Sequence, residues 1–399
     1  MHDASPTLGD VIRRFGAALH ASYGQTMTAA QKAVLSALGR CRTAALGGHL
    51  YRCDRCGAEH VAYNSCRSRH CPSCLGHKSA EWLEARAEEL LPVPYFHVVF
   101  TVPAEISSLA WKNKKTVYEI LFRAAAQTLL EIARDPRHLG ARIGFLAILH
   151  TWTQTLLHHP HVHCVVPGGG LSPDSMRWIS CRPSFFLPIK VLSRVFRGKF
   201  LALLDAAAQR GALCFSGPTA SLADPCAWRA FVRQMRGKEW VVYAKPPFGS
   251  PEHVLKYLAR YTHRVAISNR RIVSLTDEHV TFRYRDRAHG NEMRTMKLRG
   301  VEFLRRFLLH VLPKGFVRIR HFGLLANRVR DANLARCRSL LGASTATQLD
   351  FKSPTATRDE EPALLCPTCR TGRLRRIATL CPGASHQPHP AHTPFLDTS

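Results

Sequence analysis

Cysteine spacing near the N-terminus constrains the fold of this chain more than any other feature. Five of the fourteen cysteines fall between Cys53 and Cys74, and two C-x-x-C pairs, Cys53 with Cys56 and Cys71 with Cys74, are separated by 14 residues. Each C-x-x-C turn can present two thiolates to one ion, about 2.3 Å from each sulfur. The spacing therefore predicts one tetrahedral Zn²⁺ held by these four residues, structural because no position is left for a substrate.

Four further potential ligands lie close to that set. Cys41 and His49 precede it, and Cys66 and His70 lie between its two pairs. These four residues could hold a second zinc ion, which we keep as an alternative to a single site.

Positive charge is the second constraint. The chain has 56 Lys and Arg against 28 Asp and Glu, a formal net charge of +28. The excess is concentrated in residues 251–350, which carry 20 basic and 8 acidic residues. Such a field attracts polyanions, of which nucleic acid is the commonest in a cytosol, so we expect DNA or RNA as partner. Arginines among the cysteines could contact phosphate or form ordinary solvated surface: Arg52, Arg55, Arg67 and Arg69.

The composition fits a folded cytosolic protein. Hydrophobic residues make up 46% of the chain, enough for a proper core. No run of about 18 apolar residues predicts a membrane span, and the N-terminus lacks a signal-peptide core. We therefore expect a cytoplasmic location and no membrane partner.

The chain divides into three predicted parts. Residues 1–94 hold a helical opening and the cysteine cluster. Residues 95–340 mix strands, such as 96–102, with helices, such as 114–134. Residues 341–399 are rich in Thr, Pro, Ser and His and predict a flexible tail with at most one small metal knot. Its candidate ligands are irregularly spaced: Cys366, Cys369, Cys381, His386, His389 and His392.

A histidine pair lies in the predicted strand 160–166. Alternation along a strand places His161 and His163 on one face, where two imidazoles can bind a divalent metal. Gln154 lies seven residues before His161, in the strand expected to precede it. If a short turn folds that strand back antiparallel, the Gln154 amide is the third ligand of a loosely held Mg²⁺ or Mn²⁺. An H-x-H pattern alone more often marks ordinary histidines.

A predicted helix over residues 251–263 places His253, Tyr257 and Tyr261 on one face, because they are spaced four apart. Basic side chains with the same spacing line the adjacent face and could bind DNA: Lys256, Arg260 and Arg264. The tyrosines could be core residues. Held beside a metal-bound phosphate, they could instead attack it as nucleophiles.

Together these motifs resemble a known family. Residues 149–170, from Leu149-His-Thr-Trp-Thr-Gln154 through His159-Pro-His-Val-His163 to Gly170, resemble the HUH motif of bacterial two-tyrosine, rolling-circle insertion-sequence transposases. Tyr257-Leu-Ala-Arg-Tyr261 resembles their paired-tyrosine motif. Residues 53–74 resemble their N-terminal zinc domain. The motifs occur in the family's order, from about residue 41 to 327.

The resemblance implies an α+β fold, in which an antiparallel sheet carries the histidine pair on a central strand beside the tyrosine helix. It implies single-stranded DNA cleavage at the ends of a mobile element through 5′-phosphotyrosine intermediates. His161 and His163 become metal ligands and Tyr257 and Tyr261 nucleophiles. For the third ligand, His253 and His263 rival Gln154. Such a bacterial protein would associate with the nucleoid during transposition.

Two other interpretations stay open. A plasmid or phage replication initiator or relaxase would use the same chemistry. A zinc-dependent DNA-binding protein without catalysis would make the histidine and tyrosine motifs accidental.

Overall fold

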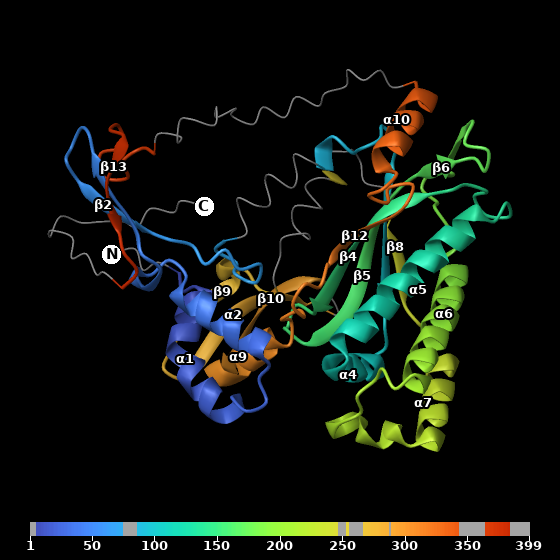
Figure 1. The fold of residues 1–399 in the computed structure, drawn as a ribbon, viewed down its shortest axis with the longest axis horizontal. Helices are drawn as coiled ribbons and strands as arrows, with labels where there is room; N and C mark the ends of the chain where they lie inside the picture. The colour runs from blue at the N-terminus through green and yellow to red at the C-terminus, as the bar shows by residue number, and fades with distance from the viewer. Residues whose placement is uncertain are drawn as a thin grey trace. The chain divides into compact units, whose positions relative to one another are not determined.

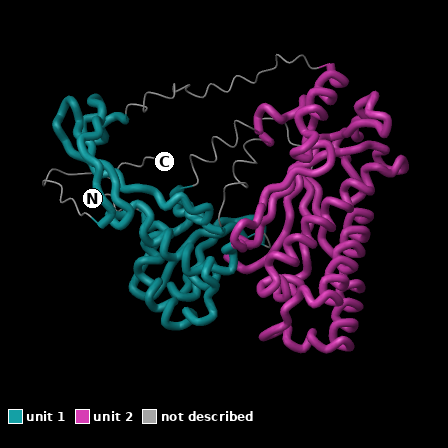
Figure 2. Tube along the Cα trace, viewed as in Figure 1, with its two compact units in different colours: residues 1–80, 263–311, 349–399 teal, residues 81–262, 312–348 magenta. Residues whose placement is uncertain are grey.

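The computed structural model describes residues 5–74, 86–245, 253–254, 266–286, 289–342 and 364–383. They form two compact units, each built from separated stretches of chain (Figures 1 and 2). Unit 1 comprises residues 1–80, 263–311 and 349–399, and unit 2 comprises residues 81–262 and 312–348. This grouping differs from the three consecutive parts expected, because contacts between distant segments outweigh sequence proximity.

Unit 2 is organised around a five-stranded sheet of order β12-β4-β5-β3-β8 in which every neighbouring pair is antiparallel. The antiparallel sheets and the helices beside them confirm the expected α+β class. The strands are β3 (Tyr95–Thr101), β4 (Gly144–Trp152), β5 (His158–Pro167), β8 (Val242–Lys245) and β12 (Ile319–Gly323). A separate ribbon joins β6 (Gly169–Leu171) to β7 (Trp178–Ser180).

Helices cover one face of this sheet (Figure 1). Alternate strand residues, such as Phe100 on β3 and Val162 on β5, are fully buried against them. The covering helices are α4 (Ala104–Lys112), α5 (Lys114–Arg134), α6 (Ile189–Gln209) and α7 (Pro225–Gly237), with a 3₁₀ turn at Gly217–Ala223. Helix α5 spans the predicted residues 114–134, and α10 (Arg330–Leu340) follows β12. The sequence of β5 therefore satisfies a period of two, with Val162, Cys164 and Val166 facing the helices.

The opposite face of the sheet carries a smaller apolar cluster. Tyr95, Leu146, Ile148 and Val165 are buried there, and Val254 is buried with them. Only residues 253–254 of the predicted tyrosine helix are described, and they are helical. Val254 therefore packs on the sheet face that α4 to α7 leave uncovered.

Unit 1 combines segments from three regions of the chain. The N-terminal helices α1 (Leu8–Tyr23) and α2 (Ala29–Arg40) each begin with a capping box, at Thr7 and Thr28. The later elements are the 3₁₀ turn Ala44–Leu46, β1 (Gly48–Cys53), β2 (Glu59–Tyr63), the 3₁₀ turn Asn269–Arg271, β9 (Ile272–Leu275), β10 (His279–Asp286), β11 (Glu292–Arg299), α9 (Gly300–Leu308) and β13 (Leu374–Leu380). Asn269 joins two of these regions, because its Oδ1 accepts from Leu8 N–H at 3.0 Å and its Nδ2 donates to Ser73 Oγ at 2.8 Å.

Two antiparallel three-stranded sheets complete unit 1, β11-β10-β9 and β13-β1-β2. The second sheet corrects our expectation for the C-terminal region. Residues 374–380 were expected in a flexible tail, but they pair with β1 from Gly48↔Leu380 to Cys53↔Leu374. Local periodicity gave no sign of this strand because its partner lies more than 300 residues away. No helix in the described part of the chain is long and apolar enough to cross a membrane.

Close packing of α1 against α9 generates a stability prediction. A Cβ atom at Gly300 would lie 2.2–2.3 Å from the Phe15 ring, so Gly300→Ala should destabilise unit 1 by about 1–3 kcal/mol through overpacking. Gly198 lies inside α6 with nothing within 4 Å of such a Cβ. Gly198→Ala should therefore stabilise the protein, by about 0.5–1 kcal/mol. Urea unfolding of both variants measures the difference, and equal stability would contradict the close contact.

Candidate active site and metal centres

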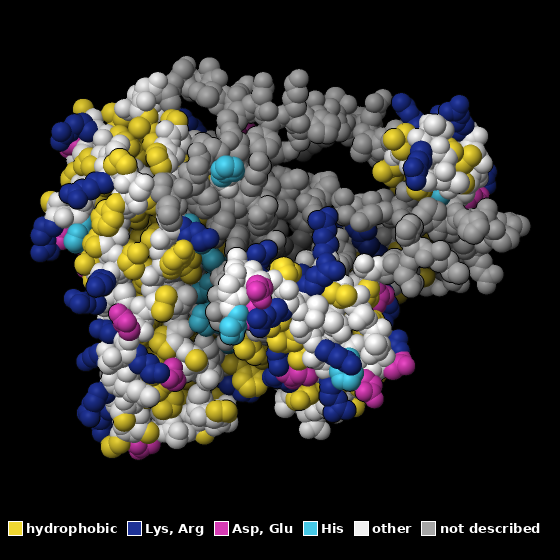
Figure 3. Space-filling view, turned by 180° about the vertical axis from the view of Figure 1, so that it is seen from behind, with side chains coloured by type: hydrophobic (Ala, Val, Ile, Leu, Met, Phe, Trp, Pro, Cys, Tyr) yellow, Lys and Arg dark blue, Asp and Glu magenta, His cyan; other side chains and the backbone are white. Residues whose placement is uncertain are grey.

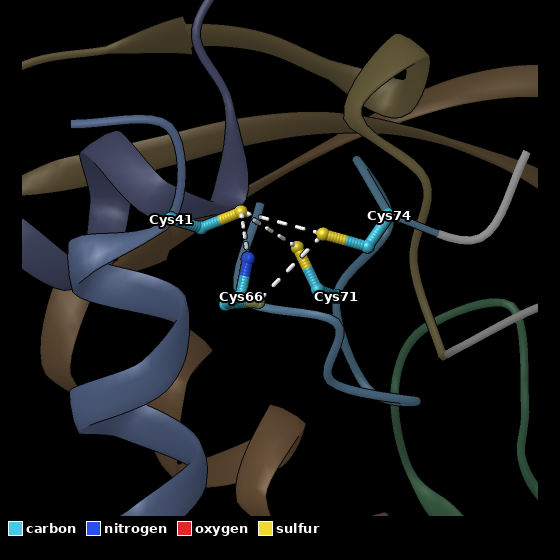
Figure 4. A group of neighbouring side chains, drawn as sticks. All are labelled: Cys41, Cys66, Cys71 and Cys74. Atoms are coloured by element: carbon cyan, nitrogen blue, oxygen red, sulfur yellow. Dashed lines mark hydrogen bonds between the residues drawn. The ribbon is translucent and has the colours of Figure 1, made fainter. Parts of the chain in front are cut away.

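Four cysteine sulfurs meet at the end of helix α2 (Figure 4). Cys41 caps that helix, and Cys66, Cys71 and Cys74 come from the loop after β2. The Sγ–Sγ distances are 3.4 Å for Cys41–Cys74, 3.6 Å for Cys41–Cys71 and 3.7 Å for Cys66–Cys74. A zinc ion about 2.3 Å from each of four sulfurs sets tetrahedral edges of about 3.8 Å. The four residues therefore fit one tetrathiolate zinc.

Backbone and thiol groups around Cys41 favour the thiolate form of this residue. The Cys66 N–H points at Cys41 Sγ over 3.5 Å. Hydrogen bonds from the neighbouring thiols, chiefly those of Cys66 and Cys71, lower the pKa of Cys41 to about 7.

The grouping of the cysteines differs from the sequence prediction. Cys53 and Cys56 do not join Cys71 and Cys74; they lie with Cys366 and Cys369 in a second group. Of the four extra candidates, Cys41 and Cys66 belong to the first cluster. His49 lies in β1 and His70 in the loop, and neither is part of a described cluster.

Three histidines form the third potential metal group in the described chain, and all lie in unit 2 on the sheet face that carries Val254. His161 and His163 are on β5, the central strand, as expected. His150 on β4 lies directly opposite His161 in the antiparallel register. Ring centroids are 4.8 Å apart for His161–His163 and 4.3 Å apart for His150–His163. One nitrogen from each ring lies within 4.8 Å of the others, close enough for all three to bind one ion.

Hydrogen bonds orient two of these imidazoles. His161 Nδ1 lies 2.7 Å from the carbonyl oxygen of His159, which can only accept, so Nδ1 carries the proton and Nε2 the lone pair. His163 Nδ1 lies 2.8 Å from Nε2 of His97, a buried residue of β3 whose ring is nearly parallel to that of His163. Both rings can thus direct Nε2 to a metal while a hydrogen bond at Nδ1 fixes the orientation of the ring.

His97 and His150 were not predicted from the sequence as site residues. Each is a histidine within an otherwise apolar strand, and that contrast was the available signal. Gln154, the predicted third ligand, lies in the turn between β4 and β5 rather than in β4. The strands do fold back antiparallel as expected, but the turn occupies residues 153–157, earlier than predicted. Consequently His150, rather than Gln154, lies opposite His161.

The tyrosine motif falls outside the described residues. The residues outside the described part include both predicted nucleophiles, Tyr257 and Tyr261, and the rival ligand His263. They also include the predicted DNA-binding side chains: Lys256, Arg260 and Arg264. His253 is described and exposed. Buried Val254, three residues before Tyr257, is the nearest described neighbour of the motif on the N-terminal side.

The described surface is strongly basic. Figure 3 shows Lys and Arg side chains spread over the face in view, with fewer Asp and Glu side chains between them. Several arginines are paired, as in Arg320 with Glu119 and Arg305 with Glu302. The formal charge of +28 leaves a large excess after such pairing. A surface of this kind suits a phosphate backbone.

A cluster of four cysteines, a histidine cluster on a central antiparallel strand and a basic surface are together typical of a metal-binding protein that acts on nucleic acid. Comparison with known proteins makes the class specific. A family described as "Putative transposase" matches residues 144–333, and a "Transposase zinc-binding domain" matches residues 11–102.

Two curated relatives agree. The chain is 51% identical over 383 residues to a "Putative transposase y4qJ" of Sinorhizobium fredii (strain NBRC 101917 / NGR234), covering 94% of this chain and 96% of the relative. It is 29% identical over 312 residues to a "Transposase for insertion sequence element IS801" of Pseudomonas savastanoi pv. phaseolicola, covering 76% and 72% respectively. No solved structure matches the chain.

The chain therefore belongs to the two-tyrosine transposase family with an N-terminal zinc-binding domain, as its motifs indicated. Membership makes it a DNA-binding protein of a class of enzymes that cut and rejoin DNA, with structural zinc.

The regrouped cysteines generate a metal-content prediction. Cys66→Ser should remove one zinc per chain, because Cys66 supplies a sulfur to the first cluster. His49→Gln should retain the wild-type zinc content, because His49 lies outside that cluster. Elemental analysis of the purified variants measures both. A Cys66→Ser protein with undiminished zinc would instead support the set predicted from sequence.

Proposed function

We propose that this transposase cuts and rejoins single-stranded DNA through 5′-phosphotyrosine intermediates at the ends of a mobile element. Tyr257 and Tyr261 are the nucleophiles. His161, His163 and His150 hold a divalent ion. Residues Lys256, Arg260 and Arg264 contact the DNA backbone, and Cys41, Cys66, Cys71 and Cys74 hold structural zinc.

The observation that carries this proposal is the sharing of one sheet face. Three imidazoles converge on the face of β4 and β5 that also buries Val254. Tyr257 follows Val254 by three residues, a span of at most about 10 Å, and we propose that its phenol lies near the histidines. If these three histidines were ordinary core residues, their ring nitrogens would not need to lie within 4.8 Å of one another, as they do.

The donor set bears on the choice of metal. Mg²⁺ prefers oxygen ligands, whereas imidazole suits ions later in the first transition series. Three imidazoles thus favour Mn²⁺ over Mg²⁺. When bound, such an ion neutralises charge on the scissile phosphate. The protein's own part is to orient the rings, and His97 does so if His163 donates its Nδ1 proton to His97 Nε2.

Strand transfer needs two nucleophiles. One tyrosine suffices to nick and reseal a strand, but moving a strand requires a second attack while the first phosphotyrosine persists. Tyr257 and Tyr261, four residues apart, could act in turn on neighbouring phosphates. In each attack the Tyr oxygen bonds to phosphorus and the 3′-oxygen leaves as a free hydroxyl end. A replication initiator or relaxase would share this chemistry, so genomic context distinguishes it from a transposase.

The histidine assignment predicts graded losses of cleavage. His161→Ala, His163→Ala and His150→Ala should each slow nicking of single-stranded DNA in Mn²⁺ on the order of 100-fold, and Gln154→Ala by less than about tenfold. DNA binding should change little, since affinity comes from the basic surface. The exposed His138 provides a control, and His138→Ala should cut normally. Normal cutting by His161→Ala or His163→Ala would refute the metal site, whereas a large loss in Gln154→Ala alone would restore that residue as third ligand.

The tyrosine assignment predicts a pattern of covalent adducts. Tyr257→Phe and Tyr261→Phe should each still form a protein–DNA adduct with labelled single-stranded DNA, while the double variant forms none. Transposition in cells should fall in both single variants, because the second attack is lost. Tyr243→Phe, at an exposed position of β8, is the matched control and should behave as wild type.

Denaturing gels decide between the alternatives. An adduct in the double variant would overturn the tyrosine assignment. Absence of nicking and of adducts in the wild-type protein, with DNA binding intact, would favour the non-catalytic interpretation.

A further inference from the structure

A second group of four sulfurs brings together two stretches of unit 1 that are distant in sequence. Cys53 and Cys56 lie at the end of β1, and Cys366 and Cys369 lie just before β13. The Sγ–Sγ distances are 3.7 Å for Cys53–Cys369 and 3.7 Å for Cys56–Cys366, across sequence separations of 316 and 310 residues. We infer that these four cysteines form a second zinc centre, which makes residues 364–383 an integral part of the zinc-binding domain.

The sulfur spacing fits a metal and not a disulfide. Both Sγ–Sγ distances match the tetrahedral edge of about 3.8 Å set by Zn–S bonds of about 2.3 Å. A disulfide would bring two sulfurs to about 2.05 Å. All four residues are free cysteines. A closed set of four thiolates is typical of a structural zinc site.

The two C-x-x-C turns have the same local geometry. In each, the residue after the second cysteine takes a left-handed conformation, with φ of 71° at Gly57 and 56° at Arg370. Backbone amides point at the sulfurs, from Cys56 N–H to Cys53 Sγ over 3.4 Å and from Gly372 N–H to Cys369 Sγ over 3.2 Å. Such N–H groups stabilise the thiolate form of a cysteine.

The two turns also fit closely against each other. A Cβ atom at Gly372 would lie 2.3 Å from Cys53 Sγ, so only glycine allows this approach. Asp54 N–H donates to the Arg373 carbonyl at 3.0 Å, and Arg373 N–H donates to Asp54 Oδ1 at 2.8 Å. Behind the sulfurs, the fully buried His60 brings Nε2 within 3.6 Å of Cys366 Sγ, where it can donate to a thiolate.

The apolar residues buried where the two C-x-x-C turns meet are too few to hold the turns together by themselves. The buried cluster comprises Tyr51, Ala62 and Leu374 besides two of the cysteines, Cys53 and Cys366. A three-stranded sheet with so small a core needs a metal or covalent link. The zinc-domain family match ends at residue 102, so it covers only half of this second site.

Metal counting on the full-length protein tests the inference. Native mass spectrometry and elemental analysis should find two zinc ions per chain. Cys366→Ser and Cys369→Ser should each lose one ion and make residues 370–376 cleavable by trypsin, because the backbone around their exposed arginines is no longer held in the turn and in β13. Cys381→Ser is the matched control, because Cys381 is exposed and outside both clusters; it should keep two ions and resist trypsin.

A variant that retains all four cysteines distinguishes a weakened metal site from misfolding caused by removal of a ligand. Gly372→Ala should lose one zinc to a chelator on the order of tenfold faster than wild type, since the added methyl displaces Cys53 Sγ. Cys41→Ser should lose the other ion and leave residues 370–376 protected. One zinc per wild-type chain, iron in place of the second zinc, or two zincs in Cys366→Ser would overturn the inference. These results do not depend on DNA cleavage, so the proposed function stands or fails separately.

Discussion

The pairing of β5 with β4 on one side and β3 on the other is the constraint on which the candidate active site depends. Because side chains alternate along a strand, burial of Val162 and Cys164 against the helices forces His161 and His163 onto the opposite face. The antiparallel register then brings His150 from β4 opposite His161, while His97 on β3 reaches His163 Nδ1. Rigid strands position all four imidazole rings, and a metal site needs such support to keep its side chains in a fixed geometry.

Sequence analysis predicted the parts of this arrangement that follow from local patterns. The period of two placed His161 and His163 on one face, and the helical period gave α5 its bounds. The third histidine was missed because register depends on where the β4–β5 turn lies. Without Gly, Pro or Asn in residues 153–157, the turn was assigned too late in the chain. The structure holds it by Thr153 Oγ1, which accepts from Leu157 N–H at 3.1 Å, and by a positive φ of 64° at Leu156.

The cysteines show the same division between local and distant information. A C-x-x-C turn is formed by neighbouring residues, so spacing alone predicted that these residues bind metal. The partner of each turn is a tertiary property. Cys71 and Cys74 join Cys41 at the end of α2, while Cys53 and Cys56 meet a turn that follows them by some 310 residues. The pairing of β1 with β13 aligns that second meeting, and no pattern in either strand alone reveals it.

Linking such distant residues is thermodynamically reasonable. Closing a loop of about 310 residues in a free chain costs on the order of 5 kcal/mol, and this cost grows only logarithmically with length. The folding of the rest of unit 1 already brings the segments together, so the cost that remains is smaller. Zinc binding to a structural thiolate site contributes about 10–16 kcal/mol at neutral pH. The free energy of metal binding therefore exceeds the cost of loop closure. A short strand pair over a few buried apolar residues supplies too little free energy to exceed that cost clearly. On this balance, the sheet β13-β1-β2 depends on the four sulfurs at its end.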